Sequence, residues 1–264
     1  MKSTTILPLM LGAMLLAPGV AQAQPSRARA PVWDVTLGVA GALRPTFEGS
    51  DHYIASPLPL VAVKWRDMIS FGDGGLSAYW HRRNFRIGAG LTFDPGRKDH
   101  STGGIFESGD DRLAGLGKID ASLGLRAFAE YRLGPLAVEV SGTKFTGGQN
   151  SGVLANLGLS MPLPLGKKLI VMPHARATWA DGTYNQTYFG VTPTQAAASI
   201  FPAFTARSGV KDVRGGVNVI WRFNNHWFAG VDASVVRLMG DAAASPISIS
   251  DTNVTAMTML GYHF

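Results

Sequence analysis

Five charged or titratable side chains recur at alternate positions of neighbouring segments and could carry chemistry together. They are Arg126, Glu130, Glu139, His174 and Arg176. In extended segments, side chains of one parity share a face, so the five would point into one interior. Burying unpaired charge is costly, which predicts that the acidic and basic groups pair with one another. We expect a network of salt bridges that fills this interior, with the lining of a narrow pore as the alternative.

A hydrolytic site is a third interpretation of the same face. His174 is the one histidine on the inner parity in mid-segment, and Ser122 and Ser160 are the candidate nucleophiles. Catalysis needs a nucleophile, a base and an orienting group within hydrogen-bond reach, and no spacing in the sequence brings these residues together. We therefore assign no catalytic residue and predict that the protein is not an enzyme.

The segment 94–118 gathers carboxylates among glycines, which raises the question of a divalent cation. Its acidic residues are Asp94, Asp99, Glu107, Asp110 and Asp111. Carboxylate oxygens suit hard cations, but the spacing matches no EF-hand loop and basic residues of the segment offset the charge. The glycines at 88, 90, 103 and 104 also lack the strand-to-helix context of a nucleotide loop. We predict a solvated external loop with no metal and no cofactor.

The elements that would position these groups are β-strands. Apolar and polar residues alternate along most of the chain, most cleanly over 119–132. As a helix, that segment would place Arg126, Glu130 and leucines on every side, so the strand period is favoured. Leu123 and Leu125 then face lipid while the charges face inwards. Further strands are predicted over 33–43, 57–65, 85–93, 136–145, 153–163, 169–179, 213–223, 227–238 and 254–264.

Short and long connections segregate to opposite ends of these strands. Turn-like sequences lie at 132–135, 164–167 and 224–226, and long polar stretches lie at 44–56, 94–118, 181–211 and 239–251. Short turns on one side and long loops on the other are typical of outer-membrane barrels. For the long loops to share one end, segment 66–84 must hold an even number of crossings. A hairpin about Gly72-Asp73-Gly74-Gly75 gives twelve strands, and ten is the alternative because each arm is short.

Both ends of the chain agree with export and insertion into a membrane. Lys2, the apolar run 6–16 and Ala21-Gln22-Ala23 predict a signal peptide, 1–23, that leaves 24–264 as a single barrel domain. At the other end, Tyr262 and Phe264 share the apolar face of the last predicted strand. We interpret this aromatic pair as the signal by which the barrel is recognised and closed.

Composition and charge narrow the class further. The chain has no cysteine, and no run of about 20 apolar residues follows Ala23, which excludes a helical membrane protein. The net charge of +6 comes from scattered Lys and Arg residues, so we predict no nucleic-acid partner. Contact with outer-membrane lipid and anionic lipopolysaccharide accounts for the charge instead. We expect an all-β, transmembrane, antiparallel up-and-down β-barrel in the bacterial outer membrane.

Four sequence elements occur in a fixed order along the mature chain. They are 47–53 with Pro57-Leu58-Pro59, then 113–120, then 188–199, and finally Tyr262-His263-Phe264. Together they resemble the MipA/OmpV family of outer-membrane proteins. That family is named for a scaffold that joins a lytic murein transglycosylase to a bifunctional penicillin-binding protein, and other members resemble adhesins or immunogenic surface proteins. The resemblance carries over no catalytic residues.

We therefore predict a non-enzymatic scaffold for enzymes that synthesise or degrade murein, or a surface interaction protein. A narrow pore for small polar solutes is the alternative, and an outer-membrane enzyme comes third.

Overall fold

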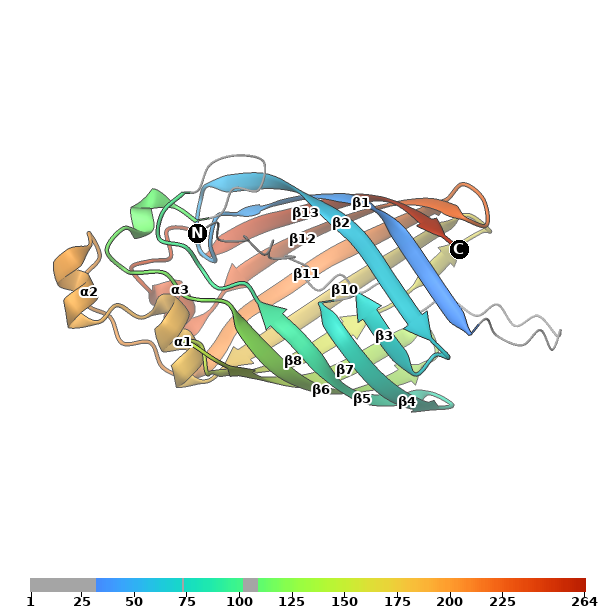
Figure 1. The fold of residues 1–264 in the computed structure, drawn as a ribbon, viewed down its shortest axis with the longest axis horizontal. Coiled ribbons are helices and arrows are strands. Elements are labelled where there is room, and N and C mark those ends of the chain that lie inside the picture. Colours follow the sequence, from blue (N-terminus) through green and yellow to red (C-terminus); the bar gives the residue numbers. More distant parts are fainter. Residues whose placement is uncertain (1–31, 73, 102–108) are drawn as a thin grey trace, which may run out of the picture.

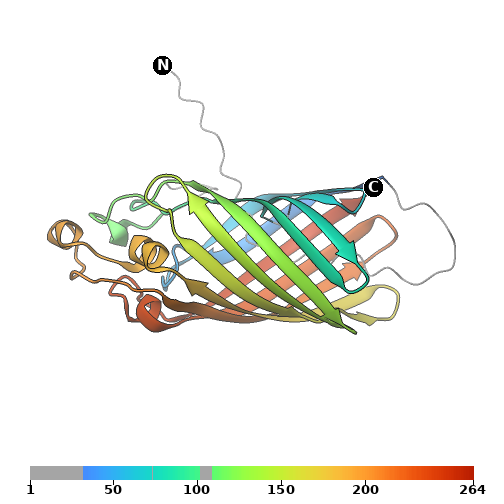
Figure 2. The same ribbon diagram turned by 90° about the horizontal axis from the view of Figure 1, so that it is seen from below.

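The computed structural model describes residues 32–72, 74–101 and 109–264. Figures 1 and 2 show long tilted strands that wrap into a barrel, with short turns at one end and long loops carrying helices at the other. The signal peptide predicted over 1–23 lies outside the described residues. In this described part, no helix is both long enough and apolar enough to cross a membrane.

The strands form one closed antiparallel sheet in which chain neighbours pair and the last strand pairs with the first. They are β1 (Trp33–Pro45), β2 (Tyr53–Trp65), β3 (Ile69–Gly72), β4 (Gly75–Arg82), β5 (Phe85–Asp94), β6 (Ser122–Leu133), β7 (Leu136–Thr146), β8 (Val153–Ser160), β9 (Leu163–Leu165), β10 (Leu169–Ala180), β11 (Gly209–Arg222), β12 (Trp227–Leu238) and β13 (Thr252–His263). Alternating side chains make this sheet apolar on one face and polar on the other.

The barrel has twelve strands across its described residues, as predicted, because β8 and β9 are two parts of one strand. Both pair with β10, and the register of His174 with Ser160 continues unchanged to Val171 with Leu163. Pro162 lies at the break, and proline has no N–H to give to the ladder.

The predicted hairpin between 66 and 84 is confirmed as β3 and β4. Gly72 and Gly74 take φ values of +137° and +83°, which glycine adopts readily. The first arm, β3, has only four residues and meets β2 only at Val63–Trp65. The β3–β4 hairpin therefore covers little of β2, which matters for the barrel wall described below.

Side-chain parity follows the predicted pattern. Leu123 and Leu125 are 48% and 57% exposed on the outer surface, whereas Glu130 is only 7% exposed on the inner side. Large apolar side chains are exposed in this way on strands all around the barrel. A surface apolar on this scale is suited to lipid and not to water.

The long loops contain helices that the alternation pattern did not predict. They are η1 (Asp111–Leu113), α1 (Gly182–Phe189), α2 (Pro193–Ala198) and α3 (Gly240–Ala244). Signals for two of them are nevertheless present in the sequence. Asp181 caps α1 by accepting from Tyr184 N, and Thr192 with Gln195 forms a capping box with a proline at the start of α2.

A further correction concerns β2. It begins at Tyr53, four residues before the predicted start at Pro57, so part of the predicted loop 44–56 is strand.

Candidate functional site: a charged belt beneath a packed lid

Charged side chains line one half of the lumen in a single row. Directly opposite residues of an antiparallel sheet point to the same face, so register alone places these groups side by side. Across β5, β6, β7, β8, β10 and β11 the row reads Arg86, Glu130, Glu139, Gly158, Arg176 and Arg214. We call these five charges, together with Arg126, the charged belt.

Two carboxylates of the charged belt hold arginines. Glu130 Oε2 accepts a hydrogen bond from Arg86 Nη2 at 2.7 Å, and Glu130 Oε1 accepts one from Arg132 Nε at 2.9 Å. Glu139 Oε1 accepts from Arg126 Nη2 at 2.6 Å. Each glutamate thus accepts a hydrogen bond from an arginine on a neighbouring strand, and Glu130 accepts a second one from Arg132.

Arg176 differs from the other members of the predicted network. It lies beside Arg214 on the adjacent strand, and among the described residues neither guanidinium has a hydrogen bond or an ion pair. The nearest acid of the row, Glu139, is already bonded to Arg126. The structure therefore brings Arg126, Glu130 and Glu139 into ion pairs and leaves Arg176 next to a like charge. That the belt closes the lumen to solutes stays a prediction.

His174 binds a partner that sequence reasoning did not select. Its Nε2 lies 3.0 Å from Asp232 Oδ2 on β12, and Ser234 Oγ donates to Asp232 Oδ1 at 3.1 Å. Ser160 is the register partner of His174, but no hydrogen bond joins the two. Ser122 lies near the looped end of the barrel, where Asn150 donates to it. Asp232 has inward parity on its strand, and this was the sequence signal by which it could have been selected as the partner of His174.

The loops at the outer end of the barrel pack into two hydrophobic clusters, which together we call the lid. The first contains Ile119, Phe145, Ala180, Tyr184, Tyr188, Phe189, Ala206, Leu238 and Ala242. The second contains Phe47, Leu113, Leu116, Val191, Phe201 and Ile247. Residues from loops far apart in sequence are thus buried against one another.

Buried polar contacts hold these lid loops in place. Arg97 Nη1 donates to Tyr188 O at 2.6 Å, and Tyr188 Oη donates to Asp94 Oδ1 at 2.8 Å. Ser245 Oγ donates to Phe189 O at 2.6 Å. Burial lowers the pKa of Arg97 to about 10, and burial also raises the pKa of Tyr188 above its usual value. Arg97 therefore stays charged and Tyr188 stays a hydrogen-bond donor at neutral pH.

The carboxylates of segment 94–118 bond to protein groups. Asp94 accepts from Tyr188 and Asn150, and Asp110 accepts from Thr46 and Arg112. Among the described residues, no group of three or more histidine or acidic side chains is placed to hold a metal ion. Glu107 lies outside the described residues. The expectation of a merely solvated loop is wrong here, because Arg97, Asp110 and Leu113 are buried in the lid.

Comparison with known proteins decides the family. The profile described as "MltA-interacting protein MipA" matches residues 37–264. The chain belongs to the MipA family. Family and fold together place this MipA-family barrel in the bacterial outer membrane. No curated protein sequence matches the chain.

Several solved outer-membrane proteins are similar to this MipA-family barrel. An outer membrane channel from Pseudomonas putida has 14% identity and a TM-score of 0.46, over 94% of this chain and 100% of its own. The translocator domain of autotransporter NalP from Neisseria meningitidis has 11% identity and a TM-score of 0.43, over 90% of each chain. In-vitro folded OmpT of Vibrio cholerae has 9% identity and a TM-score of 0.38, over 90% of this chain and 99% of its own.

Three of the four sequence elements that resemble the MipA family meet in the lid. Phe47 from the first, Leu113 and Leu116 from the second, and Val191 from the third share one hydrophobic cluster. Gln195 Nε2 adds a hydrogen bond to Leu116 O at 2.6 Å. These elements therefore assemble one structure, although they are separated by up to about 150 residues in the chain.

One ion-pair cluster anchors the η1 segment of the lid. Arg112 donates to both carboxylate oxygens of Asp110 and to Asp51 and Ser50. Chiefly the hydrogen bonds from Arg112 lower the pKa of Asp110 to about 2. A carboxyl whose folded pKa lies below its unfolded value stabilises the fold above the unfolded pKa, and this contribution is lost as pH falls.

We therefore expect the η1 part of the lid to loosen as pH falls from about 4 to about 2. The chain has no cysteine, so a single cysteine at Leu116, which is 4% exposed, reports opening by its reactivity with a dipyridyl disulfide, which still reacts with thiols in acid because protonation of its rings activates it. Each rate is divided by that of the unfolded chain at the same pH, because the thiolate is the reacting form. The label should enter only at acid pH. With Asp110→Asn added, it should enter at neutral pH as well. Equal protection of the cysteine at pH 7 and pH 2 would contradict this assignment.

The aromatic residues predicted as the assembly signal form a cluster with the last turn. Tyr262 lies edge-on to Trp227 at 5.1 Å and to Phe264 at 4.7 Å, and it stacks on His226 at 5.3 Å between ring centroids. Phe264 N donates to Val35 O at 3.0 Å, which continues the seam between β13 and β1. Their role in assembly stays a prediction.

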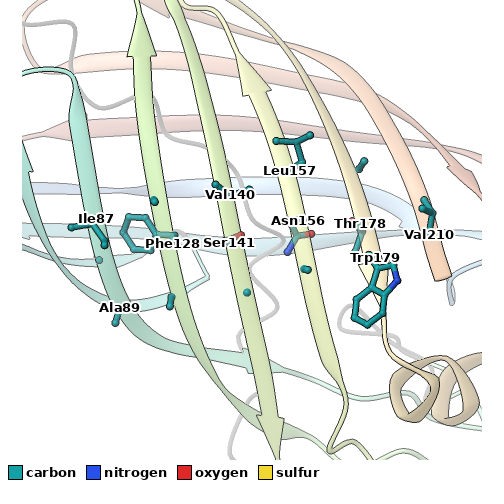
Figure 3. Close-up of a pocket in the computed structure, with 16 residues that line it drawn as sticks. Ile87, Ala89, Phe128, Val140, Ser141, Asn156, Leu157, Thr178, Trp179 and Val210 are labelled. Atoms are coloured by element: carbon teal, nitrogen blue, oxygen red, sulfur yellow. The ribbon is translucent and has the colours of Figure 1, made fainter. Parts of the chain in front are cut away.

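A hollow lies on the outer surface of the barrel. Figure 3 shows its lining, with Ile87, Val140 and Leu157 around it and Trp179 at one side. Its volume is about 820 Å³. The floor follows one register row of small, outward-facing residues, namely Ala89, Ala127, Gly142 and Ala155. Since this surface faces the membrane, the hollow belongs to the lipid-facing side and not to the lumen.

Proposed function

We propose that this MipA-family barrel is a non-enzymatic scaffold that binds cell-wall enzymes at its periplasmic end. The observation that carries the proposal is a ring of cations on the short turns opposite the lid, which we call the basic rim. Its members, all exposed, are Arg66, Arg82, Arg83, Arg132, Lys167, Lys168 and Arg222. In outer-membrane barrels the short turns lie on the periplasmic side.

Few acids offset the basic rim. Asp67 faces His81 at 3.7 Å, and Glu130 bonds Arg132 from inside the barrel. The same turns contain the apolar side chains of Leu133 and Leu165, each of which is 56% exposed. Complementary charge speeds the encounter with an acidic partner, and apolar anchors among the charges add affinity.

The family description supports the choice of partners. It names MltA as the interacting protein. We accordingly propose a lytic murein transglycosylase and a penicillin-binding protein as the partners at the basic rim. We further propose that the outward apolar face contacts lipid and that Lys144, exposed near the lid end, contacts the phosphates of lipopolysaccharide.

Crosslinking and affinity capture from native envelopes test the scaffold. The rim variant carries Arg82→Gln, Arg83→Gln, Lys167→Gln and Lys168→Gln. We expect it to recover about tenfold less of the murein enzymes than wild type, equivalent to about 1.4 kcal/mol of binding free energy. The matched control removes four exposed cations near the lid end, by Lys98→Gln, Lys118→Gln, Arg207→Gln and Arg237→Gln. Recovery that is unchanged in the rim variant, or no murein enzyme above background, would overturn the proposal.

A narrow pore is the second candidate, and one observation favours it. Arg176 and Arg214 are lumenal cations without acidic partners among the described residues, which is an environment that attracts small anions. The packed lid opposes this candidate because it covers the outer end of the lumen.

Conductance separates the two candidates. We expect wild-type protein to conduct poorly in planar bilayers, because the lid and the charged belt obstruct the lumen. Arg126→Ala with Arg176→Ala should raise the conductance several-fold and lower the thermal stability, since Glu139 loses its partner. A large and steady wild-type conductance that these substitutions barely change would favour the pore over the scaffold.

A further inference from the structure

One edge of β2 lacks a strand partner over most of its length. Its other edge pairs with β1 at every residue from Tyr53 to Trp65. On the side of β3, pairing is confined to Val63–Trp65, and no strand of the described residues pairs with that edge over 53–62. Figure 1 shows β2 diverging from β4 and β5 towards the lid. The barrel wall therefore lacks inter-strand hydrogen bonds between β2 and β5 in its outer half. We call this unpaired stretch the opening.

The opening is bounded on all sides. Below it, the tip of β3 approaches β2, where a Cβ on Gly72 would lie 3.1 Å from Ala62 Cα. On the far side, Thr92 Oγ1 of β5 donates to Gly74 O at 2.6 Å, which ties the hairpin tip to β5 and not to β2. Above it, Arg112 bonds to Asp51 in the loop between β1 and β2. It is an opening in the wall with a defined frame.

The backbone of β2 shows which residues face this opening. Thr46 N donates to His52 O, and Arg66 N donates to Val32 O. Because hydrogen-bonded pairs alternate along an antiparallel ladder, even-numbered residues of β2 direct their N–H and C=O groups to β1. Odd-numbered residues direct theirs to the opening. The positions 57 and 59, both odd, are prolines.

The two prolines keep another strand from closing the opening. Pro57 and Pro59 have no N–H, so two successive donors are missing from the free edge. Natural sheets use proline in this way to block pairing along an exposed edge. Backbone carbonyls left bare at membrane depth are tolerated where they line a water-accessible cavity, and here the lumen lies directly behind them. The two missing donors therefore disfavour an added peptide strand as the occupant.

Beside the opening, the side chains on both faces of β2 are apolar except for Ser56. Ala55, Pro57 and Pro59 point outwards and are exposed, and Ile54 and Leu60 point into the lumen, each 8% exposed. The lumenal surface continues apolar across β1 and β13 in two register rows. One row contains Ser56, Ala42 and Met257, and the other contains Leu58, Ala40 and Met259.

This apolar inner surface is set apart from the charged belt, which lies on β5 to β11. Ser56 Oγ, buried in the apolar rows, has no hydrogen-bond partner. The apolar stretch of the lumen is therefore local to the middle of β2, β1 and β13. Arg44 is opposite Ile54 at its lid end, and Asp232 is opposite Met257 on β12.

We propose that this stretch is a lateral opening through which acyl chains of the outer leaflet reach the apolar inner surface of β13, β1 and β2. Acyl chains fit because they need no backbone donor, they are the solvent on the outer side, and apolar side chains line their path inwards. The inference concerns the barrel wall and is independent of the scaffold proposed for the basic rim.

Fluorescence quenching from the lipid phase tests the opening. Ser56→Cys introduces the only thiol of the chain, which is labelled with bimane and reconstituted in phosphatidylcholine vesicles with nitroxides on their acyl chains. Ser141→Cys on β7 is the matched control. It is also a lumenal serine, 9% exposed against 8% for Ser56, but its strand is paired on both sides.

We expect lipid nitroxides to quench bimane at position 56 several-fold more than at position 141. Equal and low quenching at the two positions would overturn the proposal, because it would mean that the wall is sealed to lipid. If Ser56→Cys fails to give the heat-modifiable band of an assembled barrel, Leu58→Cys, in the neighbouring lumenal row, replaces it and is judged by the same comparison.

Discussion

Replacing Glu130 with alanine is expected to lower the free energy of unfolding by about 3–5 kcal/mol. Glu130 is 7% exposed and accepts hydrogen bonds from both Arg86 and Arg132. Arg132 is exposed and can turn to water, but Arg86 is held inside the barrel and would become an uncompensated charge. A urea titration of folding into lipid vesicles measures the change.

A double replacement separates the loss of a partner from the loss of a side chain. With Arg86→Met and Glu130→Leu together, no unpaired charge remains, so we expect most of the stability to return. If Glu130→Ala were harmless, or if the double variant were as unstable as the single one, the charged belt would not act through this ion pair.

Replacing Tyr262 and Phe264 together by serine is expected to abolish assembly of the barrel. The two rings contact each other, and Tyr262 also contacts Trp227 and His226, which lie at the β11–β12 turn beside β13. Their loss would remove the aromatic cluster at the seam where β13 pairs with β1. Unboiled gels of outer membranes should show no heat-modifiable band, and the protein should accumulate unfolded in the periplasm.

Trp80→Ser with Phe93→Ser is the matched control for this prediction. These aromatic side chains are 55% and 43% exposed on β4 and β5, away from the seam, and the double variant loses a similar apolar area. We expect it to assemble with a modest loss of stability. Normal assembly of the Tyr262 and Phe264 variant would contradict the proposed signal, and failure of both variants would show that aromatic area alone matters.

The alternation of residue types was sufficient to predict the barrel. Period two is a local property that needs no knowledge of distant residues, so it placed Leu125 outside and Glu130 inside correctly. The same logic, with the requirement that long loops share one end, predicted the β3–β4 hairpin although β3 is short. The helices of the lid were not predicted, because an alternation of period two does not identify helices. Their signals in the sequence are the capping residues Asp181 and Thr192.

The pairs within the charged belt could be predicted only in part. Inward parity correctly selected the candidates, but register decided which of them meet. Glu130 bonds Arg86 on the preceding strand, and His174 bonds Asp232 two strands away. Arg176 is placed beside Arg214, because residues 176 and 214 are opposite each other on β10 and β11. A shift of register would have given each charge a different neighbour.

By itself, the sequence determined what is local: the strand period, the faces of the side chains, the turns, and the family pattern from Phe47 to Phe264. Only the tertiary structure decided the contacts that depend on closure of the sheet into a barrel. It showed that three elements of the family pattern pack into one lid, that the charged belt runs across β5 to β11, and that β2 has a free edge beside Pro57 and Pro59. The physical reason is that side-chain direction follows from the backbone of one strand, whereas neighbours follow from the register and tilt of all the strands together.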